Sequence, residues 1–341
     1  MSVENNSAKT PLAGQKRALI TGIAGFAGSH LCEYLLSRGY EVYGTIRPHT
    51  SLDNLLGVIE RTTLLEADVS NEASLRKAIA QAEPDYLFHL AAQSAVPASW
   101  KDPRETFRVN VIGTVNVLEA IRCSKVNPVV QIAGTGEEYG LVQAHEIPIR
   151  ETNPLRPQNP HAVSKLSADL LSIQYHAAYG LKVVVTRSFN HEGPRRSAQF
   201  ATSAFALQLA EIEYGLREPI MRVGNLESRR DFTDVRDMVQ GYELAVTRGT
   251  HGEQYNLCSG QGRSIKSVLE TLIALAQVTP KIQNDPSRMR PSDTPITIGD
   301  NTKFREKTGW KPIIPFVQTM QDTLNYWRDR VRTMPTRKAS T

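Results

Sequence analysis

Short apolar runs alternate with segments of helical periodicity along the first half of the chain. The run RALITG at 17–22 predicts a strand that ends in a glycine turn, and FAGSHLCEYLLSRG at 26–39 predicts a helix that ends at Gly39. The alternation then continues along the chain. It predicts strands at 41–46, 85–91, 128–134 and 181–190, and helices at 109–122 and 161–180.

Strands that alternate with helices indicate a parallel sheet with helices on both faces. The runs ALI and VVV lack polar alternation, as expected of strands that are buried on both faces. The predicted fold class is therefore α/β, a Rossmann-type doubly wound parallel sheet. The pattern loosens after Asn190, and a smaller region interleaved with the sheet is expected, with helices at 203–214, 234–246 and 264–276.

Composition agrees with a folded protein of this kind. The 341 residues are 40% hydrophobic and 22% charged, which excludes disorder over the whole length. No apolar run reaches the roughly 20 residues of a membrane span, and the first residues lack the apolar core of a secretory signal. Cys32, Cys123 and Cys258 are far apart and form neither a disulfide framework nor a zinc pattern, so a cytoplasmic protein without a metal site is expected.

The net charge of +5 is concentrated at the two ends of the chain. Residues 328–341 hold five basic groups and one acid, and residues 1–16 hold two basic groups and one acid. The segment between them is close to neutral, whereas a nucleic-acid surface needs its positive charge on the folded body. Neither nucleic acid nor a membrane is therefore expected as a partner.

The segment TGIAGFAG at 21–28 carries the first chemical signal. Gly22, Gly25 and Gly28, with Phe26 between them, lie directly between a predicted strand and a predicted helix. Glycine lets the backbone turn tightly and approach a pyrophosphate, and the helix N-terminus behind it offers free N–H groups. This context predicts a dinucleotide-binding turn.

The end of the second predicted strand selects the cofactor. An acid there would bond a ribose 2′-hydroxyl, whereas an arginine pairs with a 2′-phosphate. The sequence reads GTIRPH at 44–49, with Arg47 and no acid. NADP is therefore favoured, with NAD as the alternative if Arg47 is a solvated surface residue.

Further motifs follow in a recognisable order. They are ADV (67–69), HLAA (89–92), VNVIGT (109–114), TGEEYG (135–140), AVSK (162–165), SFNHEGPRR (188–196), VGNLESRRDFTDVRD (223–237), YNLCSG (255–260) and RPSDTPITIGDNTKFREKTGWKP (290–312). The chain resembles extended short-chain dehydrogenases/reductases, in particular the GDP-mannose 4,6-dehydratases and the GDP-4-keto-6-deoxy-D-mannose reductases. The resemblance covers about residues 17–327 and implies a nucleotide-sugar enzyme of deoxyhexose biosynthesis.

The resemblance divides the chain into functional parts. It implies a NAD(P)-binding Rossmann domain at 17–190 and a mainly substrate-binding region at 191–327. Outside these parts lie a disordered tail at 1–16 and a basic tail at 328–341.

Cofactor and substrate contacts follow from the same resemblance. Asp68 and Val69 would flank the adenine, and Leu90, Ala91 and Ala92 would line the path to the nicotinamide. The remaining residues implied by the motifs are Lys165 at the nicotinamide ribose, Phe189 near the nicotinamide, Asn190 near the sugar, Arg230 and Arg290 at the sugar-nucleotide diphosphate, and Asp293 at the guanosine.

The catalytic motif departs from the family at one position. The family carries tyrosine four residues before the helical lysine, but here His161 precedes Lys165. A neutral histidine is a competent base near pH 7, although an imidazole is about 2 Å shorter than a phenol. Two outcomes stay open: a working His161 base, or an impaired protein that only binds nucleotide sugars.

Thr135 and Glu137 match the dehydratase T-x-E motif. In that chemistry C4 is oxidised, glutamate removes the C5 proton, water leaves across C5–C6 and hydride returns to C6. The reductases keep a similar hydroxyl–acid pair, so a dehydratase is the first expectation and a 4-keto reductase the second. A GDP-hexose substrate is implied, together with a homodimer or homotetramer that pairs through the helices at 109–123 and 161–179.

Overall fold

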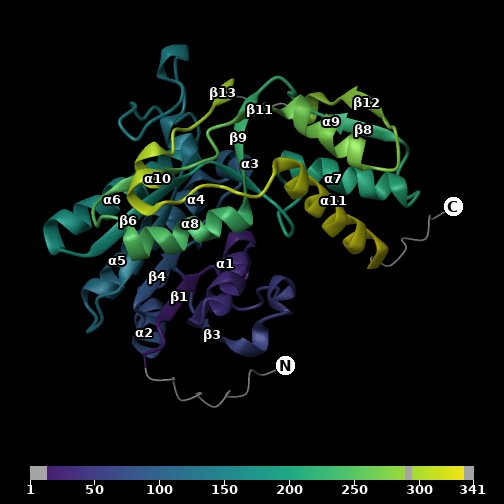
Figure 1. Ribbon diagram of the computed structural model, residues 1–341. Coiled ribbons are helices and arrows are strands. Elements are labelled where there is room, and N and C mark those ends of the chain that lie inside the picture. Colours follow the sequence, from purple (N-terminus) through teal and green to yellow (C-terminus); the bar gives the residue numbers. More distant parts are fainter. Residues whose placement is uncertain (1–13, 289–293, 334–341) are drawn as a thin grey trace.

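A parallel sheet forms the centre of the protein. The structure is a computed structural model that describes residues 14–288 and 294–333. Within these ranges seven strands pair in the order β10-β6-β5-β4-β1-β2-β3. Figure 1 labels β1, β3, β4 and β6 of this sheet. They are β1 (Arg17–Thr21), β2 (Glu41–Ile46), β3 (Thr62–Glu66), β4 (Tyr86–His89), β5 (Val129–Thr135), β6 (Lys182–Ser188) and β10 (Gln254–Leu257). The order reverses at β1, between β2 and β4, as in a Rossmann fold, which confirms the predicted fold class.

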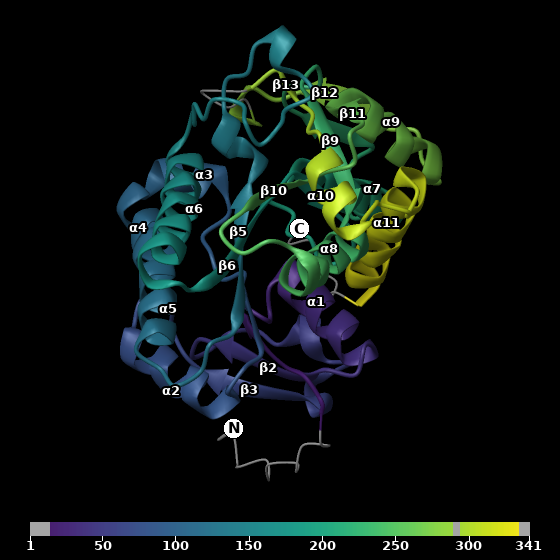
Figure 2. The same cartoon turned by 60° about the vertical axis from the view of Figure 1, so that its left-hand side comes forward.

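Helices cover both faces of this sheet (Figure 2). One face carries α1 (Phe26–Ser37) and α8 (Val235–Arg248), and the other carries α2 (Glu72–Ala82), α5 (Gly113–Arg122) and α6 (Pro160–Tyr179). Alternate residues of one strand belong to opposite cores: Ala18 and Ile20 pack on the α1 side, and Leu19 packs on the α2 side. Burial on both faces is the reason that the strands lack polar alternation.

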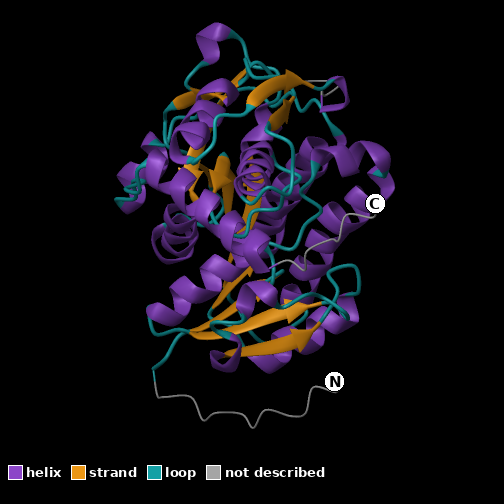
Figure 3. Cartoon of the chain, turned by 90° about the vertical axis from the view of Figure 1, so that its right-hand side faces the viewer, coloured by secondary structure: helices purple, strands orange, loops and turns teal. Residues whose placement is uncertain are grey.

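A second, smaller part packs beside the carboxyl ends of the strands. Its helices α7 (Ala201–Glu213), α9 (Ile265–Leu275) and α11 (Phe316–Thr333) contact one another. Together with β8 (Ile220–Val223) they form a separate apolar core, and the exposed strand β12 (Lys281–Asn284) pairs with β8. Figure 3 distinguishes the helices and the strands of the chain by colour. A small sheet consists of β7 (Asn190–Glu192), β9 (Arg229–Asp234), β11 (Gly262–Ser264) and β13 (Ile296–Thr297), and β7 follows β6 of the large sheet after one residue.

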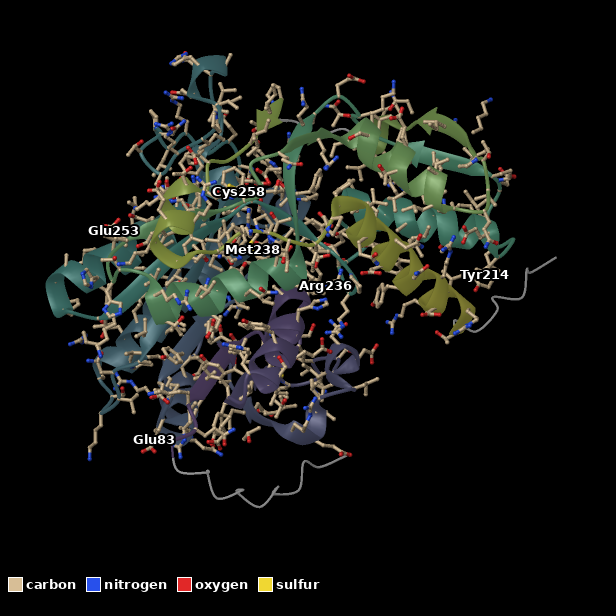
Figure 4. The ribbon with its side chains drawn as sticks, in the orientation of Figure 1. Glu83, Tyr214, Arg236, Met238, Glu253 and Cys258 are labelled. Carbon is tan, nitrogen blue, oxygen red and sulfur yellow. The ribbon has the colours of Figure 1, made fainter. Side chains whose placement is uncertain are left out.

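The two parts are interleaved. Strand β10 pairs with β6, and α8 covers the large sheet, although both come from the second half of the chain. Arg236, labelled in Figure 4 at the start of α8, lies 2.7 Å from Asp322 of α11. Helix α10 (Thr302–Thr308) continues the core through Phe304, which packs between Tyr255 and Trp310.

Several elements differ from the sequence expectation. The helix expected at 109–122 begins as a π-helical turn at Arg108–Ile112, preceded by the short helices α3 (Val96–Lys101) and α4 (Pro103–Phe107). Helix α11 continues to Thr333, so residues 328–333 of the segment expected as a tail are helical. Arg328 is held there by Glu213 of α7 at 2.7 Å. Among the described residues, no helix combines the length and apolar character needed to cross a membrane.

Candidate active site

The turn between β1 and α1 accepts only glycine at its key positions. Gly22 has a φ of +73°, and a Cβ there would lie 2.9 Å from the Cα of Ala91. A Cβ on Gly28 would lie 2.3 Å from the carbonyl oxygen of Gly22. Gly25 caps α1 without a side chain, and the first helical turn holds no acid, so its N–H groups suit an anion. This cradle fits the pyrophosphate of a dinucleotide.

A buried histidine fixes the strand ends beside that turn. His89 lies 2.8 Å from Oγ1 of Thr21 and 3.1 Å from Oγ1 of Thr114. Burial, with the nearby charge of Lys165, lowers the pKa of His89 to about 3, so the ring is neutral. The hydroxyl of Thr21 also accepts from the amide of Ala91 at 3.2 Å, which brings the chain after β4 against the glycine turn.

The residues expected at the adenosine gather at the ends of β2 and β3. Asp68 accepts hydrogen bonds from the amide and the hydroxyl of Ser70 at 2.8 and 2.7 Å. Burial raises the pKa of Asp68, but the Ser70 bonds and the charges of Arg47 and Arg108 outweigh it and lower the pKa. Arg47 is exposed, and Val69 is buried with its carbonyl bonded to Asn116 at 2.8 Å.

A cavity of about 290 Å³ runs from the glycine turn to the end of β5. It collects most of the residues expected to be catalytic or to bind the cofactor. Those that line it are Gly22, Gly25, Phe26, Gly28, Leu90, Ala92, Thr135, Glu137, His161, Lys165, Phe189, Asn190 and Arg230. Arg47, Asp68, Val69 and Ala91 lie outside this lining.

Helix α6 positions two of these side chains. Asn159 caps the helix, because its Oδ1 accepts from the amide of Ala162 at 2.8 Å. His161 in the first turn and Lys165 one turn later then lie on the same face. The carbonyl of His161 accepts from Ser164 at 2.7 Å, and Asn110 of the π-helical turn donates to that same Ser164 hydroxyl at 2.9 Å.

His161 occupies the position where the family has tyrosine. Its ring is buried, and Nδ1 lies 3.6 Å from Oε2 of Glu137. Within the described residues Nδ1 has no hydrogen-bond partner. The same Oε2 of Glu137 accepts from Nδ2 of Asn159 at 3.1 Å, and the amide of Glu137 donates to Oγ1 of Thr135 at 3.3 Å.

A buried charge cluster stands behind this pair. Glu138 accepts from the amide of Thr135 at 2.7 Å, and Nε of Arg187 lies 3.2 Å from Glu138 and 2.7 Å from Asp169. Burial first, and then the charge of Asp169, raise the pKa of Glu138 well above its usual range. The cluster locks the turn after β5 into the core, so Glu138 points inward while Glu137 lines the cavity.

Lys165 is influenced by the same acids. Burial lowers the pKa of Lys165 to about 8, although Glu138 and Asp169 both act to raise it. A lysine whose pKa lies about one unit above neutral pH keeps its charge at pH 7 and is better suited to proton exchange at a reacting group than an ordinary lysine.

Two stacked aromatic rings, those of Phe189 and Tyr139, lie beside the cavity. Phe189 is buried and stacks on Tyr139 with ring centroids 6.3 Å apart. A Cβ on Gly136 would lie 3.0 Å from the Phe189 ring, so a larger residue between Thr135 and Glu137 would press on that ring. Phe189 also lines this cavity, and Asn190 lines both this cavity and the neighbouring one.

The neighbouring cavity, of about 470 Å³, extends toward the smaller part of the protein. Arg230 on β9 lies at the junction of the two cavities. Trp100, Phe200 and Phe232 provide flat apolar surface suited to a nucleotide base. Arg290 and Asp293, which the sequence places in this region, lie outside the described residues.

Three residues of the site were not predicted from the sequence. Arg196 lines the cavity, lies over the rings of Phe26 and Phe200 at 5.1 and 3.6 Å, and has an Nε without a hydrogen-bond partner among the described residues. The two consecutive arginines of the GPRR segment at 193–196 are the sequence feature that could have identified Arg196 as a site residue. Glu138 and Asn159 resemble ordinary loop residues in the sequence, and only the fold assigns them partners.

Comparisons with known proteins agree with this geometry. The family model described as GDP-mannose 4,6 dehydratase matches residues 19–323. A Pseudomonas aeruginosa protein named GDP-6-deoxy-D-mannose reductase is 35% identical, over 93% of this chain and 99% of that protein. A human protein named GDP-mannose 4,6 dehydratase is 32% identical, over 93% of each chain.

Solved structures extend the agreement to the fold. RMD from Pseudomonas aeruginosa, complexed with NADPH, has a TM-score of 0.80 and 32% identity, over 92% of this chain and 100% of the other. A Thermus thermophilus UDP-glucose 4-epimerase complexed with NAD has a TM-score of 0.82 and 30% identity, over 92% and 99%. The chain therefore belongs to the GDP-mannose 4,6-dehydratase family of extended short-chain dehydrogenases/reductases.

Proposed function

We propose that this protein is a GDP-mannose 4,6-dehydratase that works with NADP. The observation that carries the proposal is the shared cavity, in which Thr135, Glu137 and Lys165 face the space beside the glycine turn. The adjoining cavity, with Arg230 at its junction with the first cavity, suits a nucleotide diphosphate.

The bound nicotinamide supplies the hydride acceptor and donor for the sugar carbons. The residues of the chain bind the cofactor and the substrate and transfer the protons. The glycine turn and Arg196 bind phosphate, and Lys165 holds the nicotinamide ribose. The Thr135 hydroxyl donates to the C4 oxygen, His161 exchanges the C4 hydroxyl proton, and Glu137 removes the C5 proton.

A second candidate reaction is the reduction of GDP-4-keto-6-deoxy-mannose. It is favoured by the relative named GDP-6-deoxy-D-mannose reductase, 99% of which is covered at 35% identity. The solved RMD structure complexed with NADPH supports the same candidate. Both reactions need the same proton exchange at C4, so they share His161, Thr135 and Lys165.

Two incubations separate these candidates. A dehydratase should convert GDP-mannose to the 4-keto sugar in the presence of NADP, and chromatography detects this product. Consumption of NADPH only with GDP-4-keto-6-deoxy-mannose would identify the reductase instead. UDP-glucose serves as the control nucleotide sugar, and calorimetric binding of both ligands without either turnover would mean an impaired binding protein.

Arg47 is expected to set the choice of cofactor. Arg47→Ala should raise the Kd for NADPH about tenfold or more while changing the Kd for NADH less than about threefold, because one charge-assisted phosphate contact contributes roughly 1.5–3 kcal/mol. Fluorescence titration with both reduced cofactors measures the ratio. Equal losses for the two cofactors would mean that Arg47 does not recognise the 2′-phosphate.

We propose a homodimer in the cytosol as the working assembly. Ile112, Val163 and Leu170 are exposed on the π-helical turn and α6, with exposed fractions of 50%, 37% and 53%. Residues 163 and 170 are two helical turns apart and share a face, as an interface between two α6 helices requires.

A further inference from the structure

We infer that Glu137 and His161 work as one acid–base dyad, in which Glu137 holds the proton on Nδ1 of His161 and Nε2 exchanges a proton with the sugar C4 hydroxyl. The inference rests on the proposed function for the identity of the sugar hydroxyl. It gives Glu137 a role in the C4 step, separate from the C5 proton transfer of the dehydratase reaction.

The unsatisfied nitrogen of His161 is the first observation. Nδ1 is buried and has no hydrogen-bond partner among the described residues, and a buried polar atom without a partner is unfavourable. Oε2 of Glu137 lies 3.6 Å away, about 0.8 Å beyond a charge-assisted hydrogen bond. Catalytic hydrogen bonds are often long before ligands bind and shorten in the complex. A shortening of that size in the ligand-bound state would form the bond.

The surroundings of Glu137 hold its carboxylate in place for that contact. Asn159 uses its Oδ1 to cap α6 and its Nδ2 to donate to Oε2 of Glu137 at 3.1 Å. The carboxylate therefore lies at the N-terminus of a helix of 20 residues, whose dipole favours a negative charge there. The inward anchoring of Glu138 fixes the backbone beside Glu137. Glu137 is thus positioned by groups on both sides.

The position of the histidine backbone is equally constrained. The bonds from Asn110 to Ser164 and from Ser164 to the His161 carbonyl tie the first turn of α6 to the π-helical turn. The position of the His161 ring nitrogen that faces Glu137 is therefore determined by helix α6, because His161 belongs to the first turn of this helix.

The chemistry of the dyad follows from the two ring nitrogens. With its proton on Nδ1 and directed to Glu137, the neutral ring presents a lone pair on Nε2. During oxidation the hydroxyl proton goes to Nε2, the C4 hydride leaves for the nicotinamide, and a C4 carbonyl forms. The imidazolium that results is stabilised by the Glu137 carboxylate, and reduction of the carbonyl runs through the same steps in reverse.

A dependence on Glu137 at the C4 step is then specific to histidine. A tyrosine at 161 has a single oxygen and gains its acidity from the charge of Lys165, so it has no second atom for Glu137 to hold. This difference provides the test, because Glu137 should matter for hydride transfer only while histidine is present.

The experiment is a double-mutant cycle read out by single-turnover hydride transfer at C4. In the parent protein, Glu137→Met should slow nicotinamide oxidation or reduction about 100-fold, and Glu137→Gln should slow it less, because the amide still accepts from Nδ1. In the His161→Tyr protein the cost of Glu137→Met should be at least tenfold smaller. Equal costs in both proteins would overturn the dyad. Glu60→Met, at an exposed turn away from the cavity, is the control.

A spectroscopic readout decides the matter even if no hydride transfer is detected in any variant. Histidine labelled with ¹⁵N should show the Nδ1–H tautomer at His161 in the NADP-loaded protein, with the resonance assigned from its absence in His161→Tyr. Glu137→Met should shift this ring away from that tautomer. An Nε2–H ring in the parent, or an unchanged ring in Glu137→Met, would overturn the inference. If the ¹⁵N spectra show the Glu137–His161 dyad but neither substrate is turned over, the dyad is retained and only the proposed function is rejected.

Discussion

Gly28→Ala is expected to weaken NADPH binding at least about 100-fold, or about 2.8 kcal/mol. The new Cβ would lie 2.3 Å from the carbonyl oxygen of Gly22 and 2.9 Å from the Cα of Ile23. Both contacts are with backbone atoms, so the turn itself must move and the N–H groups at the start of α1 lose their aim at the pyrophosphate. Isothermal titration calorimetry with NADPH measures the loss.

Gly57→Ala is the matched control for this substitution. Gly57 has open space around its Cβ position, so the same chemical change should leave the Kd unchanged within about twofold. A Gly28→Ala protein that melts normally and still binds NADPH at the parent affinity would contradict the assignment of the turn as the phosphate site.

Lys165→Met is expected to lower kcat about 1,000-fold in whichever reaction the parent catalyses. Lys165 lines the cavity beside His161 and holds the positive charge nearest to the reacting hydroxyl in our proposal. Methionine keeps the length of the side chain and removes the charge, so the loss reports electrostatics and proton exchange more than packing. Steady-state kinetics measures kcat, and a melting curve verifies folding.

The pH profile gives this prediction a second check. Because burial lowers the pKa of Lys165 to about 8, its charge is present below that pH and disappears as the pH rises through it. The step that needs the charge should weaken between about pH 7 and 9 in the parent, and this alkaline limb should be missing in Lys165→Met. Lys77→Met, an exposed change on α2, should retain both kcat and the limb.

The fold was easiest to predict from the sequence at positions where the local structure demands one kind of residue. Ala18, Leu19 and Ile20 form a wholly apolar run because the strand is buried on both faces, and this predicted the sheet. Gly22 and Gly28 were identifiable because no side chain fits there. Strand β10 was missed, because its short segment of mixed polarity pairs with β6 from about 70 positions away in the chain.

The site was less predictable than the fold, because its contacts join distant segments. Glu138, Asp169 and Arg187 come from three separate elements, and nothing local distinguishes them from surface charges until the fold brings them together. Glu137 and His161 were both identified, but their mutual approach depends on the turn after β5 and the cap of α6. The spacing of these two residues in the sequence does not predict that they approach each other.

The return of α8 and β10 to the large sheet means that no single cut yields a self-sufficient half-molecule. A fragment that stops near residue 190 would retain the phosphate turn but leave Leu31, Leu35 and Ile20 without the cover of Met238 and Val239. It would also expose β6 as a bare sheet edge, ready to join a foreign strand. The cofactor part of this chain therefore depends for its own solubility on residues that a linear domain map would assign to the substrate.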